Sequence, residues 1–492
     1  MNDSKIMDVL RSRYNAYTWW KVSDKDTRSV YKLAHDTLPS MFVKVYYHPF
    51  TLFQRLRNRL CPRMLQEARM LKDLKGAGIR VPEVIDQVQA GDQSALITSA
   101  IEPSTPLETV PRENQARILL KTAALLLERG FVHKDLHAGT IILDMDNKSV
   151  LVDGYAVSPR RRITRKDVIS LFGMVVSHYE ITDEQLIEHI PFKDQIDLAL
   201  IFAIRNRAHK INRARVKRLV WLSLRPGSFS EFIRTPEYTA LVRRGTAIDL
   251  DGVIAVHRSN IKHRQNLLKC QEKTQVSLVG PWCVKSYRKA RPFTTPYAIR
   301  AWKGGLTLSC NGISVPEPVA CVLFEDRSNL IVIHFLDLLT LDKILYHDYT
   351  SFPPSKRHDI PEKLGELIGR MHALGIYHAD LKACNILTDK DGIRFFLTDT
   401  DRVRQYRYLS EKRRIKNLLQ IHLSIPKHVS RPFRMRFLKG YTGETREDTK
   451  VLFSKIWGLS KGMEIVYTTD MGDKFERWDQ ESPQYPGRDQ DG

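Results

Sequence analysis

Two short stretches of the 492-residue chain carry the residues most suited to chemistry. The first is Phe131–Leu143 and the second is Ile376–Leu387, and each contains a His-x-Asp-Leu sequence. In both, the next apolar segment ends in another aspartate, Asp153 or Asp399. A loop aspartate can accept a proton from a hydroxyl group, and a strand-end aspartate can bind magnesium, which prefers oxygen ligands. These are main requirements for phosphoryl transfer to a hydroxyl group.

A lysine lies in an apolar segment upstream of each stretch, at Lys44 and at Lys285. A strand lysine can bind nucleotide phosphates, and a glutamate on the following helix can hold that lysine in place. Glu67 is placed to do so in the first copy. In the second copy Asn385 follows Asp380 by five residues, which is the spacing between the catalytic aspartate and a metal-binding asparagine in kinases.

The order of these residues predicts a phosphotransferase that uses ATP and Mg²⁺. The predicted catalytic bases are Asp380 and Asp135, the nucleotide-binding residues are Lys285, Lys44 and Glu67, and the metal ligands are Asn385, Asp399 and Asp153. The paired lysines lie 241 positions apart, the loop aspartates 245 and the strand-end aspartates 246. So constant a shift indicates a tandem duplication of one fold.

The elements needed to position these residues are those of an α+β fold. We expect two tandem protein-kinase-like bilobal domains, each with a small β-rich N-lobe and a helical C-lobe. The first is predicted at residues 1–235 and the second at 236–467, because Pro236 and Gly245 interrupt the helical pattern near the boundary. Residues 468–492 are polar and acidic, and we expect them to form a flexible tail.

Neither copy has the complete set of residues. In the first, Thr140 stands where the second has Asn385, and a single neutral hydroxyl weakens one metal position. In the second, Ala301 takes the place of Glu67, and residues 286–315 contain no Asp or Glu. Other contacts can replace a helix glutamate more easily than metal ligands can be replaced. The second copy is therefore favoured as catalytic and the first as degenerate, and inactivity of both stays open.

Three further residues in these loops have simple structural interpretations. His133 and His378 precede the loop aspartates by two residues, and we expect them to support the loops by hydrogen bonding. Cys384 is expected to be a small buried filler. A convincing glycine-rich phosphate loop is missing before the lysine in both copies.

The composition is that of a globular protein with a strong basic surplus. Hydrophobic residues make up 42%, and 78 Lys and Arg against 56 Asp and Glu give a net charge of +22. This excludes a largely disordered chain and favours an anionic partner. Residues 198–230 contain eight bases, no acid and Trp221, which suits a helix on an anionic membrane surface or a solvated helix. No nucleic-acid-binding module is recognisable, so no nucleic acid is expected.

Cysteine usage and hydropathy indicate the compartment. The six cysteines form no C-x-x-C pair, which favours a reducing, cytoplasmic environment. The N-terminal residues have no secretory signal, and the most apolar long stretch, 330–345, is interrupted by charged residues. We expect a cytoplasmic protein whose contact with the inner membrane is peripheral.

Four stretches of the second copy resemble the lipopolysaccharide core kinase family, which phosphorylates heptose or Kdo sugars in Gram-negative bacteria. They are His378–Leu387, Leu397–Val403, Arg413–Leu418 and Arg434–Tyr441. The resemblance covers most of residues 260–445 and, more loosely, 30–175. It implies a two-lobed protein-kinase-like fold with ATP and magnesium between the lobes. The Asp-x-Asp-Arg form at Asp399 favours this family over eukaryotic-type protein kinases, and His133–His137 looks similar to aminoglycoside-type phosphotransferases.

The resemblance implies that the chain phosphorylates a sugar hydroxyl of the lipopolysaccharide core oligosaccharide, with heptose as the first candidate. The residues alone predict only phosphoryl transfer to a hydroxyl group. One alternative is a tandem pseudokinase that acts as a membrane-surface scaffold or regulator in lipopolysaccharide assembly. Another is a protein kinase.

Overall fold

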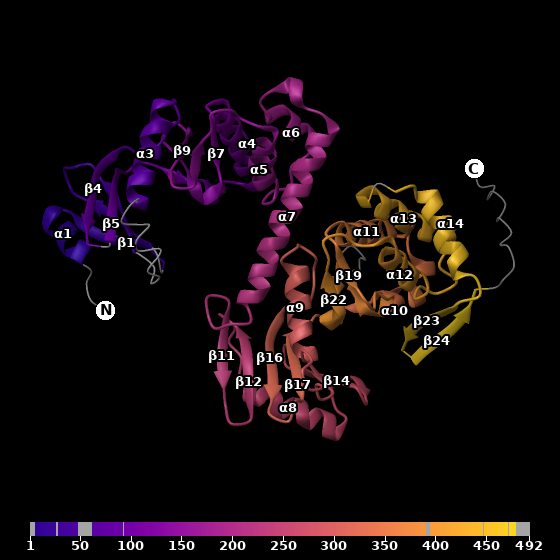
Figure 1. Cartoon of the computed structure of the whole chain (residues 1–492). Coiled ribbons are helices and arrows are strands. Elements are labelled where there is room, and N and C mark those ends of the chain that lie inside the picture. Colours follow the sequence, from indigo (N-terminus) through magenta and orange to yellow (C-terminus); the bar gives the residue numbers. More distant parts are fainter. Residues whose placement is uncertain are drawn as a thin grey trace. The chain divides into compact units, whose positions relative to one another are not determined.

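The computed structural model contains two compact units, Met1–Ala214 (unit 1) and Arg215–Gly492 (unit 2) (Figure 1). The structure describes residues 5–25, 28–47, 62–91, 93–389, 394–445, 447–470 and 472–478. The division falls inside helix α7 (Leu198–Leu222), earlier than the predicted boundary at 235/236. Pro236 instead lies between strands β11 and β12, and β12 pairs with β16 of unit 2. This pairing makes the hairpin part of the second unit.

Unit 1 begins with a five-stranded antiparallel sheet in the order β1-β2-β3-β5-β4. Its elements are α1 (Lys5–Arg13), β1 (Thr18–Lys25), β2 (Arg28–Ala34), β3 (Met41–Tyr46), α3 (Arg63–Gly76), β4 (Val84–Ala90) and β5 (Gln93–Ser99). Alternation in β3 buries Met41, Val43 and Val45 on one face, where Leu10 of α1 packs. The other side chains of β3, including Lys44, therefore face α3.

The remainder of unit 1 is mainly helical. Its elements are β6 (Thr105–Pro106), η1 (Leu107–Thr109), α4 (Arg112–Glu128), β7 (Phe131–His133), η2 (Ala138–Thr140), β8 (Ile141–Leu143), β9 (Ser149–Leu151), β10 (Val157–Pro159), α5 (Arg165–Val176), α6 (Asp183–His189), η3 (Lys193–Gln195) and α7. Leu119 and Leu126 of α4 pack with Phe172 of α5 in one core. Thr164 and Thr182 cap the N-termini of α5 and α6.

Unit 2 begins with a seven-stranded sheet in the order β11-β12-β16-β17-β15-β14-β13. Its elements are β11 (Ser230–Arg234), β12 (Tyr238–Arg243), α8 (Leu250–His263), β13 (Leu267–Gln271), β14 (Thr274–Val279), β15 (Trp282–Tyr287), α9 (Tyr297–Ser309), β16 (Pro318–Phe324) and β17 (Asn329–His334). Without the β11–β12 hairpin, the strand order is that of unit 1, and in the described residues of both units a helix, α3 or α9, lies between the third and fourth strands of the sheet along the chain. Trp302 of α9 is fully buried with Cys321 and Ile331 of the sheet.

The helical part of unit 2 follows the sheet. Its elements are β18 (Leu339–Thr340), α10 (Leu341–His347), η4 (Tyr349–Ser351), α11 (Pro354–Ala373), β19 (Ile376–His378), η5 (Ala383–Asn385), β20 (Ile386–Thr388), β21 (Phe395–Leu397), η6 (Thr400–Arg402), β22 (Val403–Gln405), α12 (Glu411–His422), α13 (Arg431–Thr445) and α14 (Thr449–Ser460). Helices α11 and α13 touch through their backbones, because a Cβ on Gly365 would lie 2.0 Å from the Phe437 carbonyl oxygen.

The chain then forms a two-stranded hairpin of β23 (Glu464–Thr469) and β24 (Gly472–Arg477). The prediction of a flexible tail from residue 468 is therefore wrong for 468–470 and 472–478, and residues 471 and 479–492 lie outside the described residues. Ile465 and Tyr467 of β23 are buried, and the Thr468 amide donates to Asp342 of α10 at 2.8 Å. Alternating burial in β23 and hydrogen bonds to α10 order a segment whose composition is polar.

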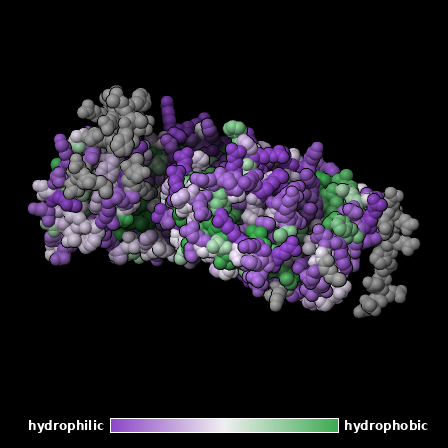
Figure 2. All heavy atoms as spheres, turned by 90° about the horizontal axis from the view of Figure 1, so that it is seen from below, coloured by the Kyte–Doolittle hydropathy of each residue, from purple (hydrophilic) through white to green (hydrophobic). Residues whose placement is uncertain are grey.

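The prediction of mixed α and β structure is confirmed. The face in Figure 2 is mainly hydrophilic, with separate hydrophobic areas. Within the described ranges, none of the helices combines the length and the apolar character needed to cross a membrane.

Candidate active site

The loop between β19 and η5 of unit 2 brings several of the predicted residues together. His378 is fully buried, and its Nδ1 accepts from the Asp380 amide at 3.3 Å. Its Nε2 therefore carries the proton and donates to the Thr398 carbonyl oxygen at 2.8 Å. Burial lowers the pKa of His378, so the ring stays neutral. The predicted supporting role of this histidine is confirmed.

Asp380 lies between a cation and an amide. The Asn385 side-chain amide donates to the Asp380 carbonyl oxygen at 2.8 Å, which leaves the Asn385 Oδ1 as an acceptor. Lys382 Nζ lies 3.2 Å from Asp380 Oδ1. Lys382 was not among the predicted site residues, although its position two residues after the loop aspartate was the available signal. Burial raises the pKa of the neighbouring Cys384 thiol to about 12, so it stays protonated.

The strand lysine of unit 2 pairs with both aspartates of the Asp-x-Asp-Arg segment. Lys285 Nζ contacts Asp399 Oδ1 and lies 3.9 Å from Asp401 Oδ1. Burial raises the pKa of Asp399, but the ion pair with Lys285 outweighs this and lowers the pKa overall. Burial and the adjacent Asp399 carboxylate raise the pKa of Asp401. Asp401 was not predicted as a site residue, because no single-residue signal distinguishes it from Asp399.

Helix α9 lies directly on this segment. A Cβ on Gly304 would meet the Thr400 carbonyl oxygen at 1.9 Å, so only glycine permits this approach. The Thr400 hydroxyl donates to the carbonyl oxygen of Ala301 at 2.9 Å. The position predicted to lack a glutamate is thus used for helix packing, and Lys285 relies on the aspartates.

Aromatic rings complete the surroundings of Lys285. Its Nζ lies 5.0 Å from the ring centroid of Tyr287, two residues along β15. The Tyr287 ring stacks on Tyr297, with centroids 5.6 Å apart. A cation over an aromatic face is stabilised by the ring quadrupole. Lys285 therefore has carboxylate and aromatic contacts although α9 offers no glutamate.

Side chains of helix α12 form hydrogen bonds with the backbone of this loop. Asn417 Nδ2 donates to the His378 carbonyl oxygen at 2.6 Å, and Gln420 Nε2 donates to the Ala379 carbonyl oxygen at 3.0 Å. Ser424, just after the helix, accepts from the Ala383 amide at 2.8 Å. These three contacts bind both ends of the loop to α12 and the residues that follow it.

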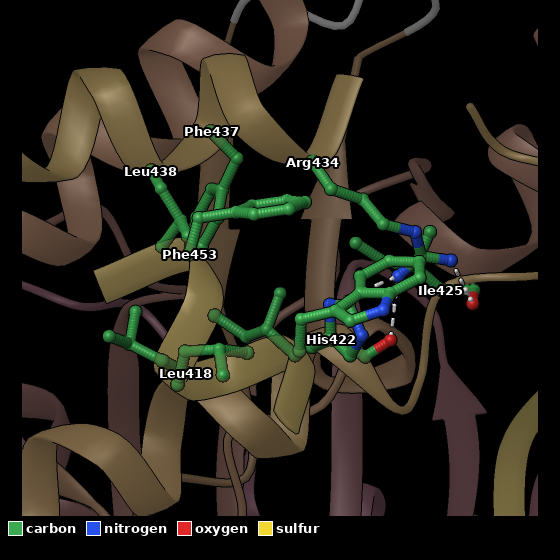
Figure 3. A pocket seen from close by; sticks show the side chains of 10 residues that line it. Leu418, His422, Ile425, Arg434, Phe437, Leu438 and Phe453 are labelled. Atoms are coloured by element: carbon green, nitrogen blue, oxygen red, sulfur yellow. Dashed lines mark hydrogen bonds between the residues drawn. The ribbon is translucent and has the colours of Figure 1, made fainter. Parts of the chain in front are cut away.

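Arg434 of α13 binds the C-terminal end of α12 in turn. Its buried guanidinium donates to the carbonyl oxygens of His422 and Ile425 (Figure 3). It also donates to the carbonyl oxygen of Pro426. Burial lowers its pKa to about 9. The surrounding pocket, lined by α12, α13 and α14, leaves about 10 Å³ of free space. We interpret it as packed core, because this volume is at the lower limit for one water molecule.

Unit 1 holds its strand lysine differently. Lys44 Nζ lies 2.6 Å from Glu67 Oε1 and donates to the Val152 carbonyl oxygen at 2.7 Å. Glu67 is fully buried on α3 and also accepts from the Tyr46 hydroxyl. The predicted pair of lysine and helix glutamate is therefore present in this unit.

The other predicted site residues of unit 1 are Asp135 and Asp153, and Thr140 stands at the position of Asn385. Asp135 is 76% exposed, and His137 Nε2 lies 3.9 Å from its carboxylate. The Thr140 hydroxyl donates to the His137 carbonyl oxygen at 2.7 Å. Asp153 Oδ2 lies 3.9 Å from Arg28 Nη1, and its buried Oδ1 has no hydrogen-bond partner among the described residues.

The two units differ in the oxygen ligands that they could offer to magnesium. Among the residues that the structure describes, no cluster of three or more His, Cys, Asp and Glu side chains could hold a metal. Magnesium needs no such cluster, since one or two protein oxygens suffice when phosphates and water supply the rest. Asp399 and Asn385 of unit 2 offer a carboxylate and an amide oxygen and fit this requirement. In unit 1, Thr140 stands where unit 2 has Asn385, and the Arg28 guanidinium lies 3.9 Å from Asp153 Oδ2.

Comparison with known sequences places unit 2 in context. Residues 282–441 match the lipopolysaccharide kinase (Kdo/WaaP) family. This stretch contains Lys285, Asp380, Asn385 and Asp399, so the predicted resemblance is confirmed for it. The chain is also 34% identical over 126 residues to 3-deoxy-D-manno-octulosonic acid kinase from Pasteurella multocida (strain Pm70). The match covers 24% of this chain and spans only half the length of that relative.

Solved structures of kinases show weaker likeness. WbdD with the kinase inhibitor LY294002 is 18% identical, with a TM-score of 0.28 over 39% of this chain and 45% of that one. The aminoglycoside-3'-phosphotransferase of type VIII is 18% identical, with a TM-score of 0.28 over 42% of this chain and 90% of that one. The PknI kinase domain of Mycobacterium tuberculosis is 16% identical, with a TM-score of 0.26 over 40% and 96%.

Proposed function

We propose that unit 2 is an ATP-dependent kinase that phosphorylates a sugar hydroxyl of the lipopolysaccharide core, with heptose as the first candidate acceptor. The observation that supports this most is the grouping of Asp380, Lys382 and Asn385 on one loop, within the stretch that matches the kinase family. The equivalent strand order of the two units supports a tandem duplication, in which unit 1 has diverged.

In this proposal each side chain has one task. Lys285 binds the nucleotide phosphates, and Asp399 and Asn385 hold magnesium, which neutralises phosphate charge. Asp380 accepts the proton of the sugar hydroxyl as its oxygen forms the bond to the γ-phosphorus and the bond to ADP breaks. Lys382, beside Asp380, is placed to stabilise negative charge on the transferred group.

We also propose that the chain works in the cytoplasm at the anionic inner-membrane surface. The end of α7 supports this, because Trp221 is half exposed and the Arg225 guanidinium stacks 3.6 Å from its ring centroid. Tryptophan beside cations suits the interface between lipid headgroups and water. Co-sedimentation with phosphatidylglycerol vesicles should fall for Trp221→Ala together with Arg225→Ala, and unchanged binding would contradict this surface.

The function is tested by phosphate transfer from ATP to dephosphorylated lipopolysaccharide core. We expect the wild-type chain and Asp135→Asn to phosphorylate the core, and Asp380→Asn to lose a factor of about 10² to 10⁴ in rate, as for removal of a general base. A core that ends at Kdo distinguishes Kdo from heptose as the acceptor. Loss of activity in Asp135→Asn alone would place the reaction in unit 1.

A pseudokinase scaffold is the second candidate. The contact of Lys285 with Asp399 favours it, because this ion pair occupies the carboxylate that would hold magnesium. Nucleotide binding without phosphate transfer to core sugar, protein or water would support the scaffold. Autophosphorylation without glycolipid would instead support a protein kinase.

A further inference from the structure

Unit 1 combines an intact lysine–glutamate pair with an arginine beside its strand-end aspartate. We propose that unit 1 is a second nucleotide site, which binds a nucleoside di- or triphosphate without a divalent metal and does not transfer phosphate. In this site the Arg28 guanidinium takes the place of the ion. The inference concerns unit 1 alone and stands or falls independently of catalysis by unit 2.

The register of the strands identifies what differs between the units. In unit 1, Arg28 of β2 pairs with Tyr46 of β3, two residues after Lys44. In unit 2, Thr274 of β14 pairs with Tyr287 of β15, two residues after Lys285. Arg28 and Thr274 thus occupy the same position of the sheet relative to the strand lysine. Only unit 1 has a cation there.

Arg28 is placed to supply positive charge beside the strand-end aspartate. Its Nη1 lies 3.9 Å from Asp153 Oδ2, so a positive charge lies beside the carboxylate that would otherwise hold the ion. A guanidinium has five N–H donors in a planar fork, so it can bind a carboxylate with some and phosphate oxygens with the others.

Lys44 supplies the second cation. Its Nζ is held by Glu67 at 2.6 Å and by the Val152 carbonyl oxygen, and the side chain is 13% exposed. Because Glu67 anchors the lysine, Lys44 does not depend on Asp153 for its position. Two cations, from adjacent strands, can therefore meet a polyphosphate whose charge is not reduced by magnesium.

The residues needed for transfer have changed in the same unit. The Thr140 hydroxyl is buried and donates to the backbone, so it offers no free amide oxygen as Asn385 does. His137 takes the place of Lys382 next to the loop aspartate. These changes affect metal binding and transfer but leave the two cations in place, which is why binding without turnover is expected.

The test is nucleotide binding by the full chain carrying Lys285→Met, which removes the phosphate-binding lysine of unit 2. We expect ATP to bind in EDTA, measured by calorimetry, with one site per chain. Arg28→Thr, which copies unit 2, should weaken this binding about tenfold or more. Lys32→Thr removes the same charge from the same strand and should leave the affinity within about twofold. No binding in EDTA, or equal loss in both variants, overturns the proposal.

A reciprocal variant keeps the test independent of folding defects in unit 1. In a chain carrying Lys44→Met, Thr274→Arg should reduce the dependence of ATP binding by unit 2 on magnesium. An unchanged magnesium dependence counts against the guanidinium as a metal substitute. Phosphate transfer to core sugar, assayed separately, reports on unit 2, so failure of one proposal does not imply failure of the other.

Discussion

The two units position the same strand lysine with carboxylates from different parts of the fold. In unit 1 the carboxylate is Glu67 on helix α3, and Asp153 instead forms an ion pair with Arg28. In unit 2 the carboxylates are Asp399 and Asp401, and helix α9 packs on their backbone through Gly304. The carboxylate that holds the lysine therefore determines whether the strand-end aspartate is paired with that lysine. The presence of the lysine alone does not identify the active copy.

The largest expected difference between the units is the loss of folding stability at acidic pH. In unit 2, burial lowers the pKa of His372 and of His257 to about 4 each, below the unfolded value of about 6.5. The unfolded state therefore binds more protons, and the stability due to the neutral rings is complete above about pH 6.5 and is lost as the pH falls toward 4. For His372 the loss is about 3 kcal/mol.

Urea-dependent proteolysis at pH 7 and pH 5, with fragments assigned to each unit by mass spectrometry, measures this. The unit 2 midpoint should fall further than that of unit 1, where burial also lowers the pKa of His133 and His209. His372→Gln should reduce the pH dependence of unit 2. Equal shifts of the urea midpoint in both units would contradict the expected difference in acid sensitivity.

The contact between α9 and the aspartate segment gives the next effect. Gly304→Ala should destabilise unit 2 by about 2 kcal/mol and lower phosphate transfer, since the new Cβ must displace the Thr400 backbone. Gly458→Ala in α14 is the matched control, because nothing lies within 4 Å of its Cβ position. That change should stabilise the helix by about 0.5–1 kcal/mol. The urea midpoints of both variants test this, and an unchanged midpoint for Gly304→Ala would contradict the close contact.

Lys382 and His137 occupy the same position in the two loops. Lys382→Met should lower kcat for sugar phosphorylation about tenfold, as for loss of one charged contact in the transition state. His137→Met should leave kcat unchanged. A fall in kcat for His137→Met, or a rise only in KM for Lys382→Met, would contradict the assignment of catalysis to unit 2.

The smallest expected effect concerns the anchor of Lys285. Asp401→Asn leaves Asp399 in contact with the lysine, so kcat should fall only about threefold. Glu67→Gln should leave phosphate transfer unaffected and weaken metal-independent nucleotide binding instead. Steady-state kinetics and calorimetry on the same two proteins check both statements. The opposite pattern would reverse the roles of the units.

The sequence was most informative where the chemistry is local. His378, Asp380 and Asn385 lie within eight residues, so their spacing alone predicted the loop that the structure contains. The pair Lys285–Asp399 spans 114 positions, and no local pattern could show that the lysine uses this carboxylate. The hairpin of β23 and β24 was missed for a related reason, because its order depends on Asp342 in α10, 126 positions away.

That hairpin also bears on the order in which the chain folds during synthesis. The contacts of unit 1 end at residue 214, so its core can form while unit 2 is still being made. Unit 2 behaves differently, because β23 donates from Val466 to the Leu423 carbonyl oxygen and from Thr468 to Asp342, and it is paired with β24. Contacts of such sequence separation form slowly. The end of α12, beside the loop that carries Asp380, is therefore completed only when β23 and β24 have left the ribosome.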